Sequence, residues 1–229
     1  MPLYTTDALI LRTYKLGESD RIVVFLTRDR GKKRGVAKNA RKSFKRFGGG
    51  LEPMTSGRVA YVEKERRELV LLNYVEPTRS PLSIMSMLSA GPGAPGVEGD
   101  GDALGYVSYF AELIDEWAQE ADPHNETLFR LGSSMVEALV EGVPADRLAR
   151  YFEYWLLRLQ GVYEANPRAS AAALAFLDAA RCSSPLGLAA VAVSAKVLRE
   201  LESSHRELIA MHLEKELKSV RVLREMRRA

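Results

Sequence analysis

The chain has 229 residues, of which 46% are hydrophobic and 28% are charged, so it can form one large domain or two smaller ones with apolar cores. No stretch approaches the roughly 20 consecutive apolar residues that span a bilayer, and the first residues lack the basic-then-apolar order of a secretory signal. A single cysteine, Cys182, excludes an intrachain disulfide. These features predict a reducing, intracellular setting, most simply the cytoplasm.

The formal net charge of +3 hides an uneven distribution along the chain. Residues 1–80 hold 18 basic and 9 acidic side chains, whereas residues 81–229 hold 15 basic and 21 acidic ones. A basic head on an acidic body is typical of a protein that binds nucleic acid.

The first 76 residues read as short strands separated by turns, because β-branched and aromatic residues alternate between glycine- and aspartate-containing segments. Strands are predicted over residues 8–14, 21–27, 34–37, 58–62 and 68–74. Five short strands with a long connection after the third predict a closed barrel, and the OB-fold is the five-stranded form that often binds nucleic acid.

After Pro77 and Pro81, apolar residues recur at spacings of three and four, which is typical of helices that pack one face into a core. We therefore expect a two-domain α+β protein, with a five-stranded OB-fold β-barrel over residues 1–78 and an all-α domain over residues 79–229. Within the second domain, the sequence predicts a flexible Gly/Pro loop at about 91–101 and a long helix at about 194–227. Helix starts are predicted where a capping side chain precedes proline, at Asp122-Pro123, Asn166-Pro167 and Ser184-Pro185.

The densest charge lies in residues 28–46, where ten of nineteen residues are basic and only Asp29 is acidic. Such a surface repels itself and is most stable against a polyanion, so nucleic-acid phosphate is the predicted target. A disordered, solvated segment is the alternative, but this run is internal and lies between strand-like segments. The predicted DNA contacts are Arg28, Arg30, Lys32, Lys33, Arg34, Lys38, Arg41, Lys42, Lys45 and Arg46.

Other residues in and near this segment extend the predicted site. Phe44 and Phe47 can either stack on bases or pack the basic loop against the barrel, and both alternatives stay open. Arg12 and Arg21 are additional DNA candidates on strands whose faces the pattern leaves open. The glycines at 48–50 lack the following Gly-Lys-Ser/Thr of a phosphate-binding loop, so they predict a flexible hinge or a close backbone approach to a ligand.

Catalytic constellations are scarce, so the sequence predicts no enzyme, no catalytic residue and no cofactor. There is no Cys-x-x-Cys pair for zinc, and Cys182 is expected to be inert packing. The acidic pairs at 115–116 and at 63 and 65 lack the third carboxylate of a magnesium-dependent nuclease. The histidines are expected to be surface or packing residues: His124, His205 and His212.

With these residues in view, the chain resembles the bacterial RecO family of recombination-mediator and DNA-repair proteins. Order and spacing agree across about the first 80 residues, and the helical remainder agrees mainly in layout. The resemblance is carried by residues 18–21, 25–32 and 36–38, by Arg41, by residues 47–49 and 51–53, and near the other end by residues 217–219.

The resemblance implies an OB-fold followed by a helical domain, binding of single- and double-stranded DNA, annealing of complementary strands, and loading of recombinase onto strands coated by single-strand-binding protein. It implies a RecR-type protein and the acidic tail of the single-strand-binding protein as partners, at the nucleoid of a bacterial cytoplasm. Many members carry a four-cysteine zinc motif, whereas residues 161–185 here offer only Cys182, so zinc is expected to be absent. Met54 stands where family chains often have Phe.

Three other functions stay open at the level of sequence. The first is an OB-fold protein that binds RNA or the ribosome, and the second is a scaffold whose basic segment binds acidic proteins or an anionic membrane. The third is a magnesium-dependent nuclease.

Overall fold

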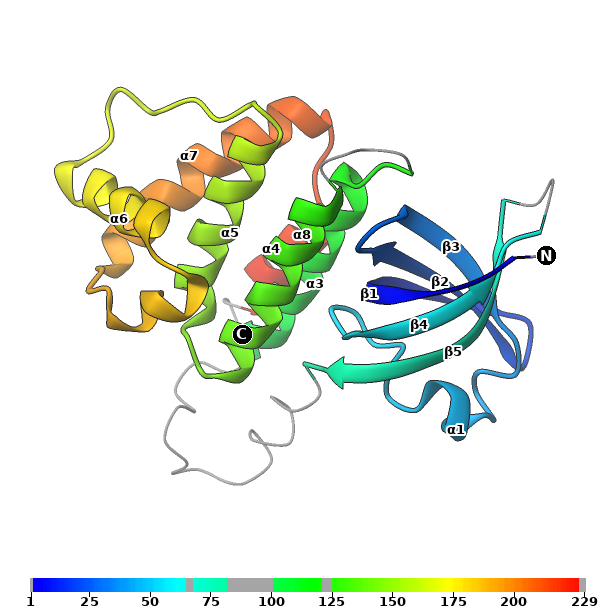
Figure 1. The fold of residues 1–229 in the computed structure, drawn as a ribbon. Helices are drawn as coiled ribbons and strands as arrows, with labels where there is room; N and C mark the ends of the chain where they lie inside the picture. Colours follow the sequence, from blue (N-terminus) through cyan, green and yellow to red (C-terminus); the bar gives the residue numbers. More distant parts are fainter. Residues whose placement is uncertain (1, 65–67, 82–100, 121–124, 227–229) are drawn as a thin grey trace.

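The computed structural model describes residues 2–64, 68–81, 101–120 and 125–226. Figure 1 shows a strand-built unit at the N-terminal side and a bundle of helices beside it. The predicted loop at 91–101 lies outside the described residues except for Gly101, and the predicted cap at Asp122-Pro123 also lies outside them. The predicted boundary between residues 78 and 79 stays a prediction.

The five strands close into a barrel in the order β1-β2-β3-β5-β4. Neighbouring strands are antiparallel except β3 and β5, which pair in parallel over only three residue pairs. This architecture, followed by helices, confirms the predicted α+β fold with an N-terminal OB-fold. The strands are β1 (Leu3–Leu16), β2 (Asp20–Thr27), β3 (Gly31–Ala37), β4 (Ser56–Val62) and β5 (Val70–Arg79).

Strand β3 begins at Gly31, three residues earlier than the sequence pattern predicts. Its first residues include Lys32 and Lys33, and lysine is depleted in strands, so local propensity hides this half of the strand. Pairing with β2 from Thr27 and Gly31 onward holds it in place. Tertiary pairing therefore decides the boundary.

Alternate residues of the strands face opposite sides of the barrel wall. Val23 and Phe25 of β2 belong to the barrel core, whereas Val24 and Leu26 belong to the buried cluster shared with the helices. The barrel core also takes Phe47, the last residue of the short helix α1 (Phe44–Phe47). Both faces of the β2 wall are therefore buried.

Most residues of the helical stripes predicted as core are buried, including Tyr106, Phe110 and Phe152, whereas Trp155 and Leu159 are only partly buried against that core. The helices are α3 (Gly101–Trp117), α4 (Asn125–Val140), α5 (Ala145–Leu159), α6 (Ala171–Cys182), the 3-10 helix η1 (Pro185–Ala190), α7 (Ala195–Leu213) and α8 (Lys218–Met226). None of the helices within the described ranges is long and apolar enough to cross a membrane.

Two of the predicted helix starts can be compared with the structure. Ser184 caps η1 by accepting a hydrogen bond from the Gly187 N–H, as predicted. The start at Asn166-Pro167 is wrong: the Asn166 side chain accepts from the Arg168 N–H in a turn, and α6 begins after the Ser170 cap. Asparagine followed by proline forms a local turn as readily as a helix cap, so the pair alone does not separate the two.

The single long helix predicted at 194–227 is wrong, because α7 and α8 are separate. Glu214 ends α7 in the left-handed conformation, with φ of 53°. The carboxylate of Glu112 on α3 then accepts hydrogen bonds from the Lys218 and Ser219 N–H groups and starts α8. The break has no glycine or proline to mark it, and its cap comes from a residue more than a hundred positions earlier.

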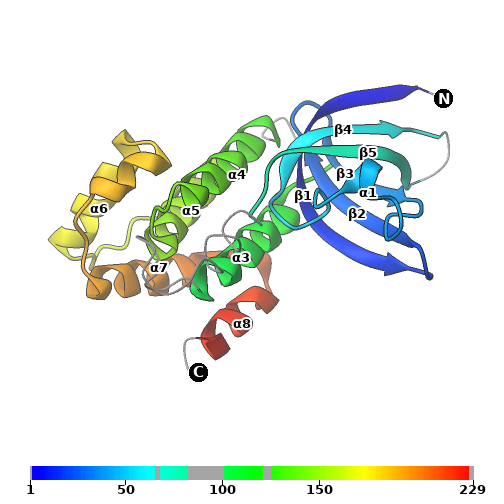
Figure 2. The same cartoon turned by 90° about the horizontal axis from the view of Figure 1, so that it is seen from below.

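The barrel and the helices form one packed unit. The outer barrel residues Leu9, Leu11, Val24, Leu26 and Met54 share a buried cluster with α3 and α4. On α4, a Cβ at Gly132 would lie 2.6 Å from Leu9 Cδ2 and 2.7 Å from Ile114 Cδ1, so glycine permits this close approach. Figure 2 shows the ends of α3 and α4 directed at the barrel strands.

Candidate nucleic-acid interface

The structure separates the predicted DNA-binding cations into groups with different surroundings. We call Arg12, Arg28 and Lys32 the interface basic group, because each pairs with a carboxylate of the helical region. We call the cations that follow along β3 and through α1 the outer basic group. Its members are Arg34, Lys38, Arg41, Lys42, Lys45 and Arg46.

The interface basic group is neutralised by α3 and α4. Arg12 Nε lies 2.7 Å from Asp115 Oδ2, and Lys32 Nζ lies 3.3 Å from Asp115 Oδ1 and 2.6 Å from the Asp115 carbonyl oxygen. Arg28 Nε lies 3.4 Å from Glu126 Oε1. Partial burial works to lower the pKa of Arg12, but the Asp115 carboxylate, Tyr14 and the Glu112 carboxylate together outweigh it and raise that pKa. These cations hold the barrel to the helices.

The turn between β2 and β3 lies directly against the end of α3. Gly31 has φ of 69°, and a Cβ there would overlap the Glu120 carbonyl oxygen. The Lys32 N–H points at the Gln119 carbonyl oxygen, at 3.4 Å. This contact explains why Arg28 and Lys32, on the two sides of Gly31, reach the carboxylates of the helical region. Their predicted contact with DNA stays a prediction.

Arg30 and Lys33 have partners on the barrel itself. Lys33 Nζ lies 3.0 Å from Glu63 Oε1, and the Arg30 guanidinium lies 4.0 Å from the centre of the Tyr4 ring. Tyr4 packs on Tyr61, whose pKa burial and the nearby Glu63 carboxylate raise to about 12. These two cations thus belong to a cluster with aromatic and acidic neighbours.

The outer basic group is the part of the predicted site that carries uncompensated charge. Four members, Arg34, Lys38, Lys42 and Lys45, have exposed side chains without an ion pair in the described part of the chain. Their segment continues into α1, which Figure 1 shows beside β5 and apart from α3 and α4. Arg21 of β2 pairs in register with Ala37, the residue before Lys38 of this group.

The two remaining members, Arg41 and Arg46, order the outer loop. The Arg41 guanidinium donates to the Glu18 carbonyl oxygen at 3.0 Å, and Arg46 donates to Ser43 Oγ at 3.1 Å and to the Lys38 carbonyl oxygen. These acceptors are neutral, so the bonds fix the loop without cancelling its charge. The outer group is therefore both ordered and cationic.

For Phe47 the structure selects the packing alternative, because its ring is buried in the barrel core with 1% exposure. The side chain of Phe44 lies outside the described part of the structure, so its stacking on bases stays a prediction. Of the three glycines, Gly50 packs tightly: a Cβ there would lie 2.8 Å from the Phe47 carbonyl oxygen and 2.9 Å from Val75 Cγ1. The close approach of the backbone to β5 of the same chain therefore explains the glycine at position 50.

Of the carboxylates weighed for a nuclease, Glu65 lies outside the described residues and the other three have cationic partners. Asp115 pairs with Arg12 and Lys32, Glu116 pairs with Lys215, and Glu63 pairs with Lys33. Among the described residues, no group of three or more His, Cys, Asp or Glu side chains is placed to hold a metal ion. Cys182 is exposed at the end of α6, so the prediction that it packs in the interior is wrong.

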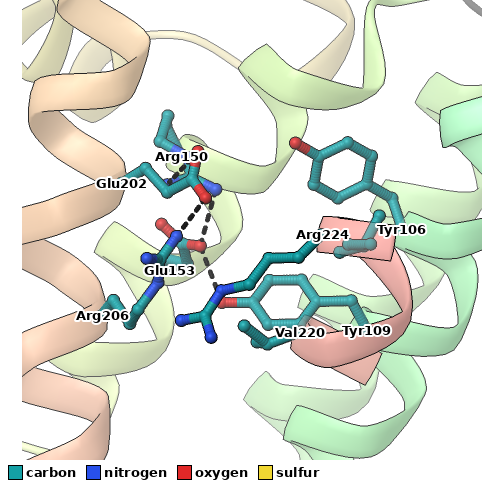
Figure 3. Close-up of a pocket in the computed structure, with 9 residues that line it drawn as sticks. Tyr106, Tyr109, Arg150, Glu153, Glu202, Arg206, Val220 and Arg224 are labelled. Atoms are coloured by element: carbon teal, nitrogen blue, oxygen red, sulfur yellow. Dashed lines mark hydrogen bonds and ion pairs between the residues drawn. The ribbon is translucent and has the colours of Figure 1, made fainter. Parts of the chain in front are cut away.

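Sequence reasoning missed a buried polar cluster in the helical region, shown in Figure 3. Arg150 and Glu153, with 3% and 2% exposure, form an ion pair of 2.9 Å. Glu153 also accepts from Tyr109 Oη at 2.7 Å and lies 3.0 Å from His205 Nδ1. The cluster joins α3, α5 and α7 next to a small pocket that α8 helps to line. Charged residues at i and i+3 within an apolar stripe were its only signal.

Two histidines pack against their neighbours, as predicted. His205 is buried within this cluster, and the ring of His212 stacks on Trp117 with centroids 5.4 Å apart. The pKa of Tyr109 is raised well above its ordinary value, first by burial and then by the neighbouring Glu153 carboxylate. His124 lies outside the described residues.

Comparison with known proteins agrees with this two-part architecture. A family model described as "Recombination protein O N terminal" matches residues 1–81, and one described as "Recombination protein O C terminal" matches residues 98–165. The chain belongs to the RecO family. The first RecO model covers the whole barrel, and the second begins before α3 and ends after α5.

Similar RecO proteins come from several bacteria. The "DNA repair protein RecO" of Koribacter versatilis is 38% identical over 159 residues, covering 69% of this chain and 59% of that protein. The "DNA repair protein RecO" of Anaeromyxobacter sp. strain K is 36% identical over 180 residues, covering 78% and 61%. That of Bifidobacterium adolescentis is 51% identical over 76 residues, covering 33% and 30%. The chain thus spans about three-fifths of the length of the first two relatives.

Proposed function

We propose that this RecO-family chain is a non-enzymatic DNA-binding protein of DNA repair and homologous recombination. The observation that carries the proposal is the outer basic group, an ordered set of cations on an OB barrel, four of which are exposed and unpaired within the described residues. Each Lys or Arg that neutralises a phosphate releases condensed counterions, so this surface favours a polyanion of any base sequence. Both single- and double-stranded DNA meet that requirement.

The same surface provides a physical basis for strand annealing. Two DNA strands repel each other, and a cationic surface that contacts both lowers the barrier to their pairing without consuming a nucleotide. Loading of recombinase onto strands coated by single-strand-binding protein is the finer part of the proposal. It rests on the family resemblance, as do a RecR-type partner, the acidic tail of the single-strand-binding protein and a place at the bacterial nucleoid.

The test separates the outer basic group from total charge. Lys38, Lys42 and Lys45 are changed to Glu, and the matched control changes Arg168, Lys196 and Arg199, three exposed cations of the helical region, to Glu. The outer variant should lose most of its binding to labelled single-stranded DNA and its annealing of the complement, while the control keeps both. Each lost phosphate contact should also reduce the slope of log affinity against log salt by about 0.7.

Lys32 is left out of this test because its reversal would place a carboxylate against Asp115 and disturb the fold. Undiminished binding by the outer variant would contradict the proposal. Competition with RNA of equal length distinguishes the RNA-binding alternative, which predicts a strong preference for RNA.

A further inference from the structure

An open groove runs along the barrel between β3 and β5. The two strands pair only over residues 35–37 of β3 and 70–72 of β5, so the hydrogen-bonded contact between them is short. The residues that line the groove are Val36, Lys38, Lys64, Glu68, Leu69, Val70 and Leu71. These residues divide into an apolar floor and a charged rim.

The floor is formed by side chains that face away from the barrel core. Val36 of β3 is the register partner of Leu71 of β5, so their side chains lie next to each other on one face. Leu69, in the bend just before β5, lines the same groove as Leu71, whereas Val70 between them is also buried in the barrel core. Val36, Leu69 and Leu71 are all half-buried, which leaves apolar surface available to a ligand.

The rim is mainly cationic. Lys38, in the turn after β3, and Lys64, in the link between β4 and β5, both line the groove, and neither has an ion pair with a described residue. Arg34 extends the rim along β3, since it lies two positions before Val36 and is exposed. Among the described residues of the lining, Glu68 is the acidic one. The groove therefore offers apolar contact in its centre and positive charge along its sides.

A ligand that fits this arrangement has apolar faces and a regularly charged backbone. An unpaired nucleic-acid strand has both, because its bases can leave the stack while its phosphates stay outside. A duplex keeps its base faces stacked inside the helix, so it can reach the rim but not the floor. Phe47, the buried aromatic of the outer loop, does not supply base contact in its place.

We propose that this groove holds the bases of single-stranded DNA on Val36, Leu69 and Leu71, between phosphates bound by Lys38 and Lys64. The outer basic group then contacts any phosphate backbone, and the groove gives preference to an unpaired strand. This inference rests on the proposed DNA-binding function and adds to it the site that distinguishes single from double strands.

The test removes the floor and keeps the charge. The double variant Leu69→Ser, Leu71→Thr is compared with Leu174→Ser, which changes an exposed leucine on α6. Binding is measured by fluorescence anisotropy with an oligothymidylate of roughly 16 nucleotides, the upper site size of an OB-fold, and with a duplex of equal length. The dissociation constant for the single strand should rise about tenfold in the double variant, by loss of the aliphatic surface that the bases cover. The duplex affinity should stay unchanged, and the control should change neither.

Equal weakening of both ligands, or no weakening of the single strand, would overturn the groove while leaving DNA binding intact. Wild-type protein that bound neither ligand would overturn the proposed function itself. A second measurement avoids any change in folding caused by the double variant. In Leu69→Trp, the fluorescence of the new tryptophan should be quenched by oligothymidylate and not by the duplex, and the opposite result would overturn the inference.

Discussion

The interface basic group and the outer basic group differ in whether a carboxylate lies next to each cation. Lys32 and Lys42 are ten residues apart in one cationic run, yet Lys32 lies against Asp115, whereas Lys42 is exposed without an ion pair in the described chain. The deciding residues belong to α3 and α4, far along the sequence. Charge density therefore identifies where cations gather, and the acidic neighbours decide which of them remain free for a ligand.

The largest effect is expected at the turn that brings the interface basic group to the helices. Gly31→Ala adds a Cβ that overlaps the Glu120 carbonyl oxygen and also disfavours the positive φ. We expect the free energy of unfolding to fall by about 3 kcal/mol, from combined overpacking and backbone strain. Urea denaturation of the variant and the wild type measures this difference in the free energy of unfolding.

The control for this change is Gly17→Ala. Gly17 also has a positive φ, of 61°, but no atom lies within 4 Å of an added Cβ. It should cost about 1 kcal/mol, the backbone term alone. Equal losses at the two glycines would mean that close packing of the turn on α3 contributes little.

A second, smaller effect should separate the two groups directly. Lys32→Glu places a carboxylate beside Asp115 and removes a cation that also donates to the Asp115 carbonyl oxygen. We expect a loss of about 2 kcal/mol in the free energy of unfolding, within the range for breaking a partly buried charge network. Lys45→Glu, an exposed change in the outer group, should stay within about 0.5 kcal/mol. A thermal shift as large for Lys45→Glu as for Lys32→Glu would remove the distinction.

The smallest of the three expected losses of stability concerns Glu112. This carboxylate contacts Arg12 of the interface basic group and also accepts hydrogen bonds from the first residues of α8. Burial works to raise the pKa of Glu112, but hydrogen bonds from Ser219 and Lys218, together with Arg12, outweigh it and lower that pKa. Its contribution to stability is therefore fully present above the ordinary glutamate pKa of about 4.3 and is lost as the pH falls through the lower folded value.

Glu112→Gln should cost about 1 kcal/mol or more at neutral pH, because the charge is lost and the amide offers one accepting oxygen where the carboxylate offers two to the α8 N–H groups. The difference from wild type should shrink as the pH falls below the ordinary value, since the wild-type carboxylate then gains a proton. Unfolding free energies measured across the acidic range test this. A constant difference at all pH values would show that the charge of Glu112 does not stabilise the fold.

Much of the fold could be predicted from local pattern. The alternation in β2 and the three- and four-residue spacing from Tyr106 to Trp117 are short-range signals that the packing preserves. The basic half of β3 could not be predicted in the same way, because it is held by pairing with β2 rather than by its own propensities. The break after Leu213 depends on Glu112, more than a hundred residues away.

The candidate site was predictable as a region and not residue by residue. The density of Lys and Arg in residues 28–46 is a property of the sequence, but whether each side chain faces a carboxylate depends on the docking of the helices. Arg12 shows the difference most clearly, because its partners Glu112, Asp115 and Glu116 follow it by about a hundred positions. The groove between β3 and β5 arises from barrel closure, which no local pattern specifies.

The carboxylate of Glu112 also ties the two ends of the described chain together. One of its oxygens lies 3.6 Å from Arg12 of the first strand, and both accept hydrogen bonds from the first turn of the last helix. Among the described residues, a tag or truncation that displaces α8 would leave Glu112 with Arg12 as its remaining partner. Changes at α8 should therefore weaken the contact between the barrel and the helices. A fusion partner that must not affect stability is better attached at an exposed loop.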